Sequence, residues 1–570
     1  LAALEAVVGH LDSGDGPPDP FELLDQITAL VDQSLVRQLD RVADQSRFAM
    51  YQTIHEFAEG ELAARDETDA ARRAHAEWVV GLIETGAPML AGPDQLDWLD
   101  RFETEHDNIR AALAFAIEER ETDLAHRVAG LLWGFWSLRG HQQEGNRWYQ
   151  RVLELPIDVP TVDYAHCLRG AAEIASEQGR FAEAMEHYER ALAIARSFGD
   201  SRQERQITGA MANAAYGQGS FDEATRLHRE AIALHEAAGD RAALAKSFNN
   251  LGTVSLYLNR LDEAEAEYGR AREILVELGD RRSALVVLGN IGSVVRARGE
   301  SERSVEIQRE VLAGMREIGD ERGIGSALSN LANAYVELGD LDQAERYCRQ
   351  SLEILEQLGL TRMIALAQLS LAQIAMGRGE NVAAIGWAAE SLANLAACGD
   401  IASSGVLLGM LGDLAFTIGE PVRSARLFGG AMAQIEAANA QDAIEDHAQY
   451  ERTVGRTRDA LGPERYAEEF AAGKATSLDE LRRAARELQR IAADAPRDPK
   501  EAEIERRTGL NGRDVQALRL FVAGNSNQEI ADEIGMTLPE AVALVGRIYA
   551  KLGVESRAEV TAFAFKNGLV

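Results

Sequence analysis

Polar and cationic side chains near the end of this chain have the types and spacing to contact a polyanion. Ser526, Asn527 and Gln528 are consecutive, and Arg547 and Lys551 lie one helical turn apart. Cationic groups bind phosphate, while amide and hydroxyl groups hydrogen-bond to phosphate and to base edges. This segment therefore has the chemistry of a nucleic-acid contact.

Short helices must position these groups. We expect Gly524 to end one helix, Ser526 to cap the next, and Thr537 to cap a third helix that carries Arg547. Together these elements predict a compact four-helix segment at 509–570.

This segment resembles the LuxR-type helix-turn-helix over its whole length. The runs that carry the resemblance are Gly524-Asn525-Ser526-Asn527-Gln528-Glu529-Ile530-Ala531 and Ile548-Tyr549-Ala550-Lys551-Leu552. The resemblance implies that the third helix lies in the major groove of promoter DNA, with two copies of the chain on two half-sites. It makes the following residues candidates for DNA contact: Ser526, Asn527, Gln528, Thr537, Glu540, Ala543, Arg547 and Lys551.

The third helix departs from the family pattern. Family members usually place Arg, Thr, Lys and His where this chain has Pro539, Glu540, Val542 and Leu544. Apolar side chains make no phosphate contact, and each lost contact lowers the salt dependence of binding by about one unit. Glu540 has the wrong sign for a polyanion, although it favours a helix N-terminus. Two interpretations stay open: a DNA-binding domain, or a helix-turn-helix kept for packing or dimerisation.

A forty-residue period runs through the middle of the chain. Gly-Asp recurs at Gly199, Gly239, Gly279, Gly319 and Gly399, and a second series of helix stops follows half a period away, at Gly179, Gly219, Asn259, Gly299, Gly339, Gly379 and Gly419. Two stops per period predict helix–turn–helix units of about 20 residues per arm. Such units bury their apolar faces only by stacking into a solenoid.

The period resembles the tetratricopeptide repeat. One unit places Leu251-Gly252, Ala264, Tyr268 and Ala271 at the family's spacing, and about seven units fit residues 161–440. Asn250, Asn290 and Asn330 lie on the first helix of three successive units. The resemblance places them in a concave groove, where amides can bond a peptide backbone. The alternative is that asparagine is simply common in the repeat.

The remaining segments resemble parts of STAND-class signalling ATPases of actinobacterial type. Strands at Ser34–Leu39 and Arg47–Tyr51, followed by a helix at Thr53–Ala64, predict a winged-helix remnant. In these proteins a winged helix passes into helical repeats, and a LuxR-type reader often ends the chain. The expected domains are a winged-helix remnant (1–65), a helical linker domain (66–160), the repeats (161–440), a helical connector with a Pro-rich linker at Ala495–Pro499 (441–502), and the helix-turn-helix (503–570).

The ATPase machinery itself is absent from the sequence. No Gly-x4-Gly-Lys-Ser/Thr motif occurs, and Gly473-Lys474 is followed by Ala475. Without such a loop to hold phosphates, nucleotide hydrolysis is not expected. The chain starts at Leu1 without Met, inside an apparently helical stretch. We therefore expect an N-terminal P-loop domain to be missing, and ATP or ADP to bind only if that domain is present.

No other residues form a recognisable catalytic or metal-binding set. The 11 histidines are dispersed; His228 and His235 lie seven residues apart but have no further ligands at metal spacing. Carboxylate pairs such as Asp222-Glu223 open helices, where they complement the helix dipole. We expect no enzyme, no metal and no catalytic residue.

The net charge and the cysteine content limit the possible partners and the cellular compartment. The net charge is −33, yet residues 503–570 hold 8 Lys/Arg and 9 Asp/Glu, so the acidity lies outside the last segment. The whole chain is therefore not a nonspecific nucleic-acid binder. Three scattered cysteines and the lack of a long apolar run favour a reducing cytoplasm and no membrane partner.

Together these observations predict an all-α protein: a tetratricopeptide-like solenoid after a small winged-helix remnant and before a LuxR-type domain. The expected function is transcriptional regulation, in which the solenoid senses a protein, peptide or small inducer and the tail contacts promoter DNA. The alternative is a non-catalytic interaction scaffold with a degenerate helix-turn-helix. The sequence does not specify the promoter, the inducer or the oligomeric state.

Overall fold

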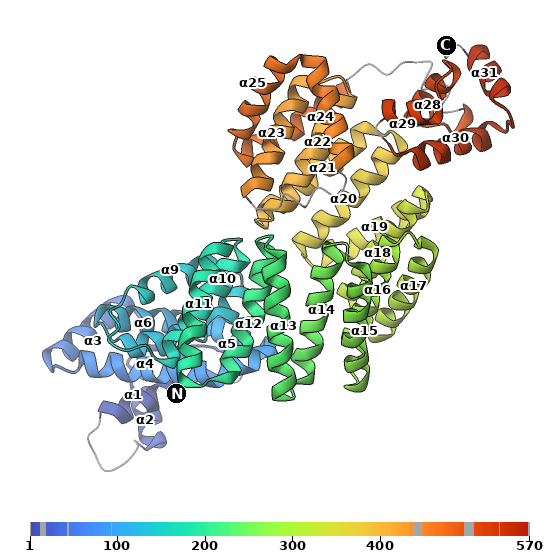
Figure 1. Ribbon diagram of the computed structural model, residues 1–570. Coiled ribbons are helices and arrows are strands. Elements are labelled where there is room, and N and C mark those ends of the chain that lie inside the picture. Colours follow the sequence, from blue (N-terminus) through green and yellow to red (C-terminus); the bar gives the residue numbers. More distant parts are fainter. Residues whose placement is uncertain are drawn as a thin grey trace. The chain divides into compact units, whose positions relative to one another are not determined.

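The computed structural model describes residues 2–11, 19–42, 45–92, 94–437, 447–494, 507–534 and 536–567. The chain divides into two compact units, Leu1–Gly217 and Gln218–Val570 (Figure 1). Helices dominate both units, and strands occur in one two-stranded sheet within the described ranges. The predicted all-α fold class is confirmed. The linker expected at Ala495–Pro499 lies outside the described residues.

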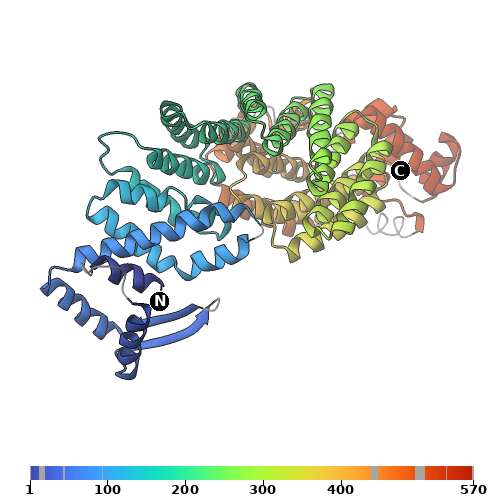
Figure 2. The ribbon, with the colours of Figure 1, turned by 90° about the horizontal axis from the view of Figure 1, so that it is seen from below.

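The first unit begins with two helices and a β-hairpin (Figure 2). Their bounds are α1 (Ala2–Leu11), α2 (Pro20–Asp32), β1 (Val36–Val42), β2 (Gln45–Met50) and α3 (Gln52–Ala64). The strands are antiparallel, with Val36 opposite Met50. This agrees with the expected ribbon and helix. The first strand starts two residues later than predicted because Ser34 adopts a φ of 59°, which is a turn conformation.

A helical region with an aromatic core follows. It comprises α4 (Thr68–Gly86), the 3₁₀ turn η1 (Ala87–Ala91), α5 (Gln95–Thr104), α6 (His106–Glu118), α7 (Thr122–Ala129), α8 (Trp133–Leu138) and α9 (Gln142–Leu153). Phe102 and Phe135 are fully buried and meet edge to face at 5.7 Å. A Cβ at Gly86 would lie 2.3 Å from the Trp98 ring. Close packing of large rings therefore holds α4, α5 and α8 together.

The forty-residue period is a succession of fourteen helices. The first unit contains α10 (Val162–Glu177), α11 (Phe181–Phe198) and α12 (Ser201–Gly217). The second contains α13 (Phe221–Ala238), α14 (Arg241–Tyr257), α15 (Leu261–Glu277), α16 (Arg281–Ala297), α17 (Ser301–Ile318), α18 (Glu321–Glu337), α19 (Leu341–Gln357), α20 (Thr361–Arg378), α21 (Asn381–Ala397), α22 (Ile401–Thr417) and α23 (Pro421–Ala437). The predicted solenoid of about seven helix pairs is confirmed.

The predicted helix stops are left-handed turns. Every glycine of both series has a positive φ, and Asn259 adopts the same conformation at 55°. Glycine tolerates this geometry without a Cβ penalty, and asparagine is the side chain that follows it most readily. Several of the following helices then begin at an aspartate; Asp240, Asp280 and Asp320 each accept a hydrogen bond from the backbone N–H three residues onward.

The first helices of neighbouring repeats form the inner side of the solenoid in the second unit. Contacts join α14 to α16, α16 to α18, and α18 to α20, and they are more extensive than those between the second helices of neighbouring repeats. Small residues permit close crossing within a pair: a Cβ at Gly252 would lie 2.9 Å from the Tyr268 ring. The solenoid therefore curves toward α14, α16, α18 and α20.

Three more helices close the end of the repeats: α24 (His447–Leu461), α25 (Pro463–Lys474) and α26 (Leu478–Asp494). The backbones of α25 and α23 touch, since a Cβ at Gly473 would lie 2.0 Å from the carbonyl oxygen of Arg426. Gly473 is therefore needed for the close packing of these two helices.

None of the helices in the described part of the chain combines the length and apolar character required to cross a membrane.

Candidate nucleic-acid interface

The candidate interface lies in a four-helix domain at the end of the chain (Figure 1). Its helices are α28 (Gly512–Val522), α29 (Asn527–Ile534), α30 (Leu538–Leu552) and α31 (Arg557–Lys566). They share a core of their own, which includes Leu510, Val515, Leu518, Phe521, Ile530, Met536, Leu544, Val545, Ile548 and Val560. Because all four helices contribute to this core, the domain has the internal packing of an independent unit.

Each of the first three helices begins with a reciprocal capping box. The Asn511 side chain accepts from the Asp514 backbone, and the Asp514 carboxylate accepts from the Asn511 backbone. Ser526 pairs in the same way with Glu529, with its backbone N–H 2.7 Å from the carboxylate. Such boxes satisfy backbone donors that a helix start leaves unpaired.

The third box joins Thr537 and Glu540 at the start of α30. The Thr537 hydroxyl donates to the Glu540 carboxylate at 2.8 Å, and the Thr537 backbone N–H donates at 2.7 Å. The predicted caps at Ser526 and Thr537 are therefore present. Since Glu540 neutralises the N-terminus of α30, its negative charge serves helix geometry.

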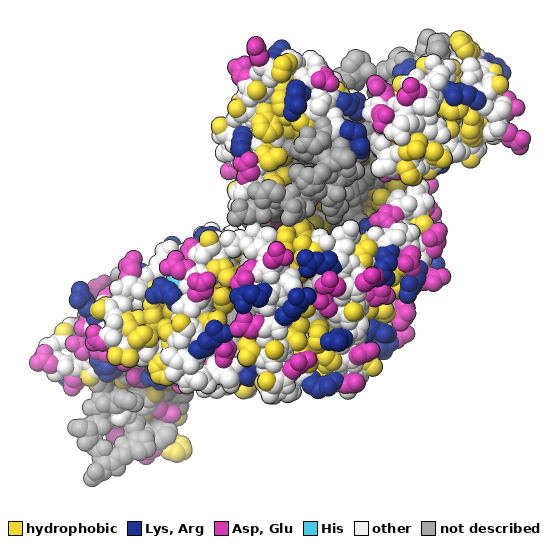
Figure 3. Space-filling model, viewed as in Figure 1, with side chains coloured by type: hydrophobic (Ala, Val, Ile, Leu, Met, Phe, Trp, Pro, Cys, Tyr) yellow, Lys and Arg dark blue, Asp and Glu magenta, His cyan; other side chains and the backbone are white. Residues whose placement is uncertain are grey.

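The faces of α30 separate the apolar replacements into two groups. Ala541, Leu544, Val545 and Ile548 are buried, so Leu544 belongs to the domain's core. Val542 is 50% exposed and Leu538 is 42% exposed. In the view of Figure 3, hydrophobic side chains gather on the edge of the domain along which α30 runs. Val542 is therefore the position at which an exposed polar contact is replaced by an apolar side chain. Leu544 is apolar because it packs in the core of the domain.

Lys551 holds a buried carboxylate. Its ammonium lies 2.7 Å from Oδ2 of Asp514, a residue that is 1% exposed. The Lys551 side chain itself is 35% exposed. This ion pair ties the last turn of α30 to the first turn of α28. A role of Lys551 in DNA contact, predicted from the resemblance, competes with this internal pairing.

The other predicted contact residues lie around the start of α29 and along α30. Asn527 is half-buried, and the Gln528 amide donates to Asp532 at 2.8 Å. Ala543 is exposed and Arg547 is half-buried on α30. The fold thus brings the polar start of α29 and the exposed side of α30 into one domain, as the helix-turn-helix arrangement requires.

Arg513 was not foreseen as an important residue. Its guanidinium donates to the backbone carbonyl of Met376 at 3.2 Å, at the end of α20. Burial lowers the pKa of Arg513, Glu540 and Asp413 raise it, and Arg547 lowers it further. A Cβ at Gly339 would lie 3.7 Å from Nη1 of Arg547. In this arrangement α28 and α30 face the turns of the repeats, which no pattern in the sequence indicated.

Arg557 also has an internal role. It donates to the carbonyl oxygens of Phe521 and Asn525 at 2.6 and 3.0 Å, and its guanidinium lies 4.2 Å from the centre of the Phe521 ring. Arg507 and Arg519 are exposed on the same domain and were not among the predicted contact residues. Both residues precede the two runs that carry the LuxR-type resemblance, so those runs did not point to them.

The asparagine ladder of the repeats is half-buried. The Asn290 amide on α16 donates to Oδ1 of Asn249 on α14 at 2.9 Å, and Asn249 donates to Asn250 at 3.3 Å. Asn330 lies on α18, next along the inner side. Amides of neighbouring repeats therefore bond one another across this face, and contact with a peptide remains a prediction.

Comparison with known families identifies both kinds of domain. Residues 509–564 match the bacterial regulatory proteins of the luxR family. Residues 203–277 and 283–357 match a tetratricopeptide repeat family, and residues 165–200 match a second one. The chain carries tetratricopeptide repeats and a C-terminal LuxR-type domain. The two resemblances found in the sequence are thereby confirmed.

Curated relatives share part of the chain. It is 35% identical over 155 residues to "Putative HTH-type transcriptional regulator Rv0890c" of Mycobacterium tuberculosis and equally to "Putative HTH-type transcriptional regulator Mb0914c" of Mycobacterium bovis. The matched segment covers 27% of this chain and spans 17% of the length of each relative.

Two solved structures show partial similarity to the chain. A STAND protein with a tetratricopeptide repeat sensor, PH0952 of Pyrococcus horikoshii, gives a TM-score of 0.42 at 16% identity, covering 85% of this chain and 65% of that one. The aspartyl phosphate phosphatase F of Bacillus subtilis gives 0.40 at 14% identity, covering 55% and 91% respectively.

Proposed function

We propose that this chain is a non-catalytic transcriptional regulator whose C-terminal domain binds promoter DNA and whose repeats bind a protein, peptide or small inducer. The observation that carries the proposal is the complete LuxR-type domain at 509–564, with its own core and a capped helix at each position of the motif. The names of the curated relatives support the same role. We place this activity in the cytoplasm and assign no cofactor to the chain.

The DNA contact would be built from few groups. The cations of α30 are Arg547 and Lys551, and Lys551 is paired with Asp514. Asn527 and Gln528 offer amides at the start of α29. Ser526 and Thr537 can add hydroxyl contacts at the two helix starts. With few phosphate partners, we expect a shallow dependence of affinity on salt. A single domain of this type covers one half-site, so a dimer on DNA is part of the proposal.

A binding assay with two forms of the protein tests the proposal. The isolated segment 507–570 and the full chain would be titrated into labelled duplex taken from upstream of the gene. Arg547→Ala should weaken binding by about tenfold and reduce the salt slope by about one unit. Lys566→Ala, at the end of α31, is the matched control. If neither form bound the duplex at low salt, DNA binding would be excluded as a function of this chain.

The scaffold alternative rests on the commitment of polar groups to packing. Lys551 pairs with Asp514, Glu540 caps α30, and Val542 presents an exposed apolar side chain. The LuxR-type pattern usually has a polar residue at that position. If the repeats captured a protein partner while the tail ignored duplex DNA, this alternative would replace the regulator.

A further inference from the structure

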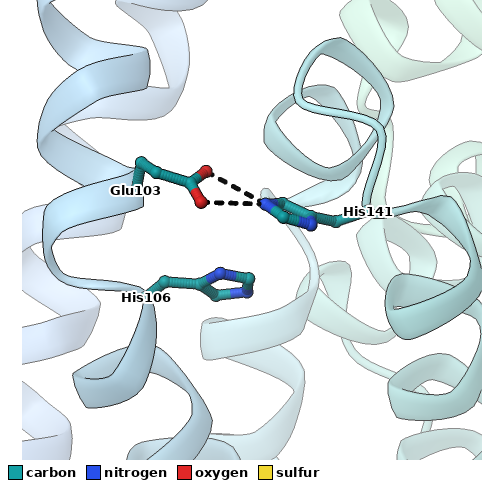
Figure 4. Close-up of side chains that lie close together, drawn as sticks. All are labelled: Glu103, His106 and His141. Atoms are coloured by element: carbon teal, nitrogen blue, oxygen red, sulfur yellow. Dashed lines mark hydrogen bonds and ion pairs between the residues drawn. The ribbon is translucent and has the colours of Figure 1, made fainter.

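Three side chains of the first unit meet at the junction of α5, α6 and α9 (Figure 4). Glu103 lies in the last turn of α5, and His106 is the first residue of α6. His141 is the N-cap of α9 and follows Gly140, whose φ of 77° turns the chain back from α8. Helix ends and a left-handed turn therefore deliver the three side chains to one point.

The ligand-type atoms of these residues are close together. Nε2 of His141 lies 3.0 and 3.2 Å from the two carboxylate oxygens of Glu103. The imidazole rings of His106 and His141 are 4.6 Å apart between centres. One ligand atom from each of the three residues lies within 4.8 Å of the other two. A tetrahedral zinc site separates its ligand atoms by about 3.3 Å, so small side-chain rotations would close this set around an ion.

His106 supplies a buried nitrogen that the protein leaves without a hydrogen bond. The residue is 5% exposed, and its Nε2 has no hydrogen-bond partner. Burial is the main cause that lowers the pKa of His106; Glu144 raises it, while Arg110 and His141 lower it. Within the described protein, Nε2 of His106 is thus a buried nitrogen that no hydrogen bond occupies, and imidazole nitrogens are common ligands of transition-metal ions.

A second carboxylate near His106, that of Glu144, is bound by other residues. Glu144 lies 3.3 Å from Nε2 of His106, but Arg110 binds both of its oxygens, at 2.7 and 2.6 Å. Trp148 donates a further bond at 3.2 Å. These partners lower the pKa of Glu144 to about 2. Glu144 is thus held in place by Arg110 and Trp148, and its carboxylate adds negative potential beside His106.

We propose that Glu103, His106 and His141 form a binding site for one divalent transition-metal ion, with zinc the best match. Two imidazoles and one carboxylate are a ligand set that zinc accepts, and three protein ligands leave a fourth position for water. The side chains of Glu103 and His141 are 44% and 27% exposed, which gives the ion a path from solvent. The bound ion would fix the relative positions of α5, α6 and α9.

Zinc titration of the full chain tests this proposal. Metal-free protein would compete with a chromophoric chelator for added Zn²⁺ at pH 7.5. We expect one tightly bound ion per chain. Glu103→Gln and His141→Gln should each weaken binding by at least about tenfold. His55→Gln is the matched control, because His55 is exposed on α3 and lies beside Glu59 at 3.7 Å, away from the cluster.

Glu103→Gln keeps the experiment decisive if a histidine variant fails to fold. The side chain is partly exposed, and the amide can still accept a hydrogen bond from His141. Circular dichroism would verify its helical content. The proposal is overturned if the wild-type chain takes up no zinc from the chelator. It is equally overturned if Glu103→Gln and His55→Gln bind zinc as tightly as the wild-type chain.

Discussion

In the repeats, equivalent polar side chains perform the same local task in one period after another, whereas in the C-terminal domain Lys551, Arg557 and Arg513 each have a separate task. Arg241 pairs with Glu277, and Arg281 pairs with Glu317 one period later. Acidic and basic side chains alternate over the surface of the repeats in Figure 3. Such exposed pairs contribute little individually, so the loss of one is tolerated.

The C-terminal domain has no such redundancy. Lys551 neutralises a buried carboxylate, Arg557 bonds two backbone carbonyls, and Arg513 contacts the end of α20. Few cations remain for a nucleic acid, and the proposed function therefore depends strongly on Arg547. The difference teaches that a segment can retain a family's fold while its cationic residues are used for packing.

The largest expected effect is at Lys551. Lys551→Met leaves the Asp514 carboxylate buried without its counter-ion and should lower the free energy of unfolding of the 507–570 segment by about 3 kcal/mol. Urea unfolding measures this, and Lys566→Met is the control. A variant that unfolds like the wild type but no longer binds DNA would show that Lys551 is a DNA contact, contrary to the comparison drawn here.

The next effect is a difference in acid sensitivity: the stability of the repeats should fall at low pH more than that of the C-terminal domain. His228, on α13, is 2% exposed, and burial lowers its pKa to about 4. In the unfolded chain His228 binds a proton near pH 6.5, whereas in the folded chain it does so only near pH 4. The folded state is therefore not penalised by this residue above pH 6.5, and the free energy of unfolding falls as the pH drops from 6.5 toward 4. The loss from this residue is about 3 kcal/mol.

Residues 503–570 contain no histidine and should lack this dependence. Unfolding of the full chain and of the 507–570 segment would be compared at pH 7 and pH 5. In the full chain, His228→Leu should reduce the effect of acid. Equal acid sensitivity of wild type and variant would exclude His228 as its source.

Removal of one repeat cap should have a smaller effect. Asp280 accepts a hydrogen bond from the Ser283 backbone at 3.0 Å, so Asp280→Ala should cost about 1 kcal/mol. Glu300 occupies the N-cap of α17 but its side chain makes no capping hydrogen bond, only an exposed ion pair with Arg303 at 3.1 Å. Glu300→Ala is therefore a matched control with little expected change. Denaturant midpoints compare the two. A larger cost for Glu300→Ala would contradict the assigned caps.

The smallest expected effect is that of Asn259→Gly, at the stop of the two series that is not glycine, and Asn259→Val provides the contrast. Asn259 has a φ of 55°, which costs an asparagine more than a glycine. Asn259→Gly should leave stability within about 0.5 kcal/mol of the wild type, while Asn259→Val should destabilise by about 1–2 kcal/mol. Thermal unfolding distinguishes these outcomes; a neutral valine variant would mean that the turn is not held in this conformation.

Regular local features were predictable because they follow from neighbouring residues. The period of glycine stops specified the repeat helices, and the spacing of Ser526 with Glu529 specified a helix start. The LuxR-type motif likewise specified the order of α28 to α31. Each of these depends on interactions within a few residues, which a single sequence displays directly.

The structure changed the interpretation of particular side chains. Leu544 was grouped with Val542 as a lost contact, yet one is in the core and the other is exposed. Lys551 was assigned to DNA, but 37 residues separate it from the Asp514 that it pairs with. Glu103, His106 and His141 did not stand out because the third residue lies on another helix.

The sequence by itself determined the helices, their turns, the repeat period and the family of the last domain, because short-range hydrogen bonds and steric limits fix these features. Only the tertiary structure decided which cations stay available, which face of α30 is buried, and that Glu103, His106 and His141 lie close together. Those outcomes depend on how helices pack, and packing brings together residues whose separation along the chain carries no signal.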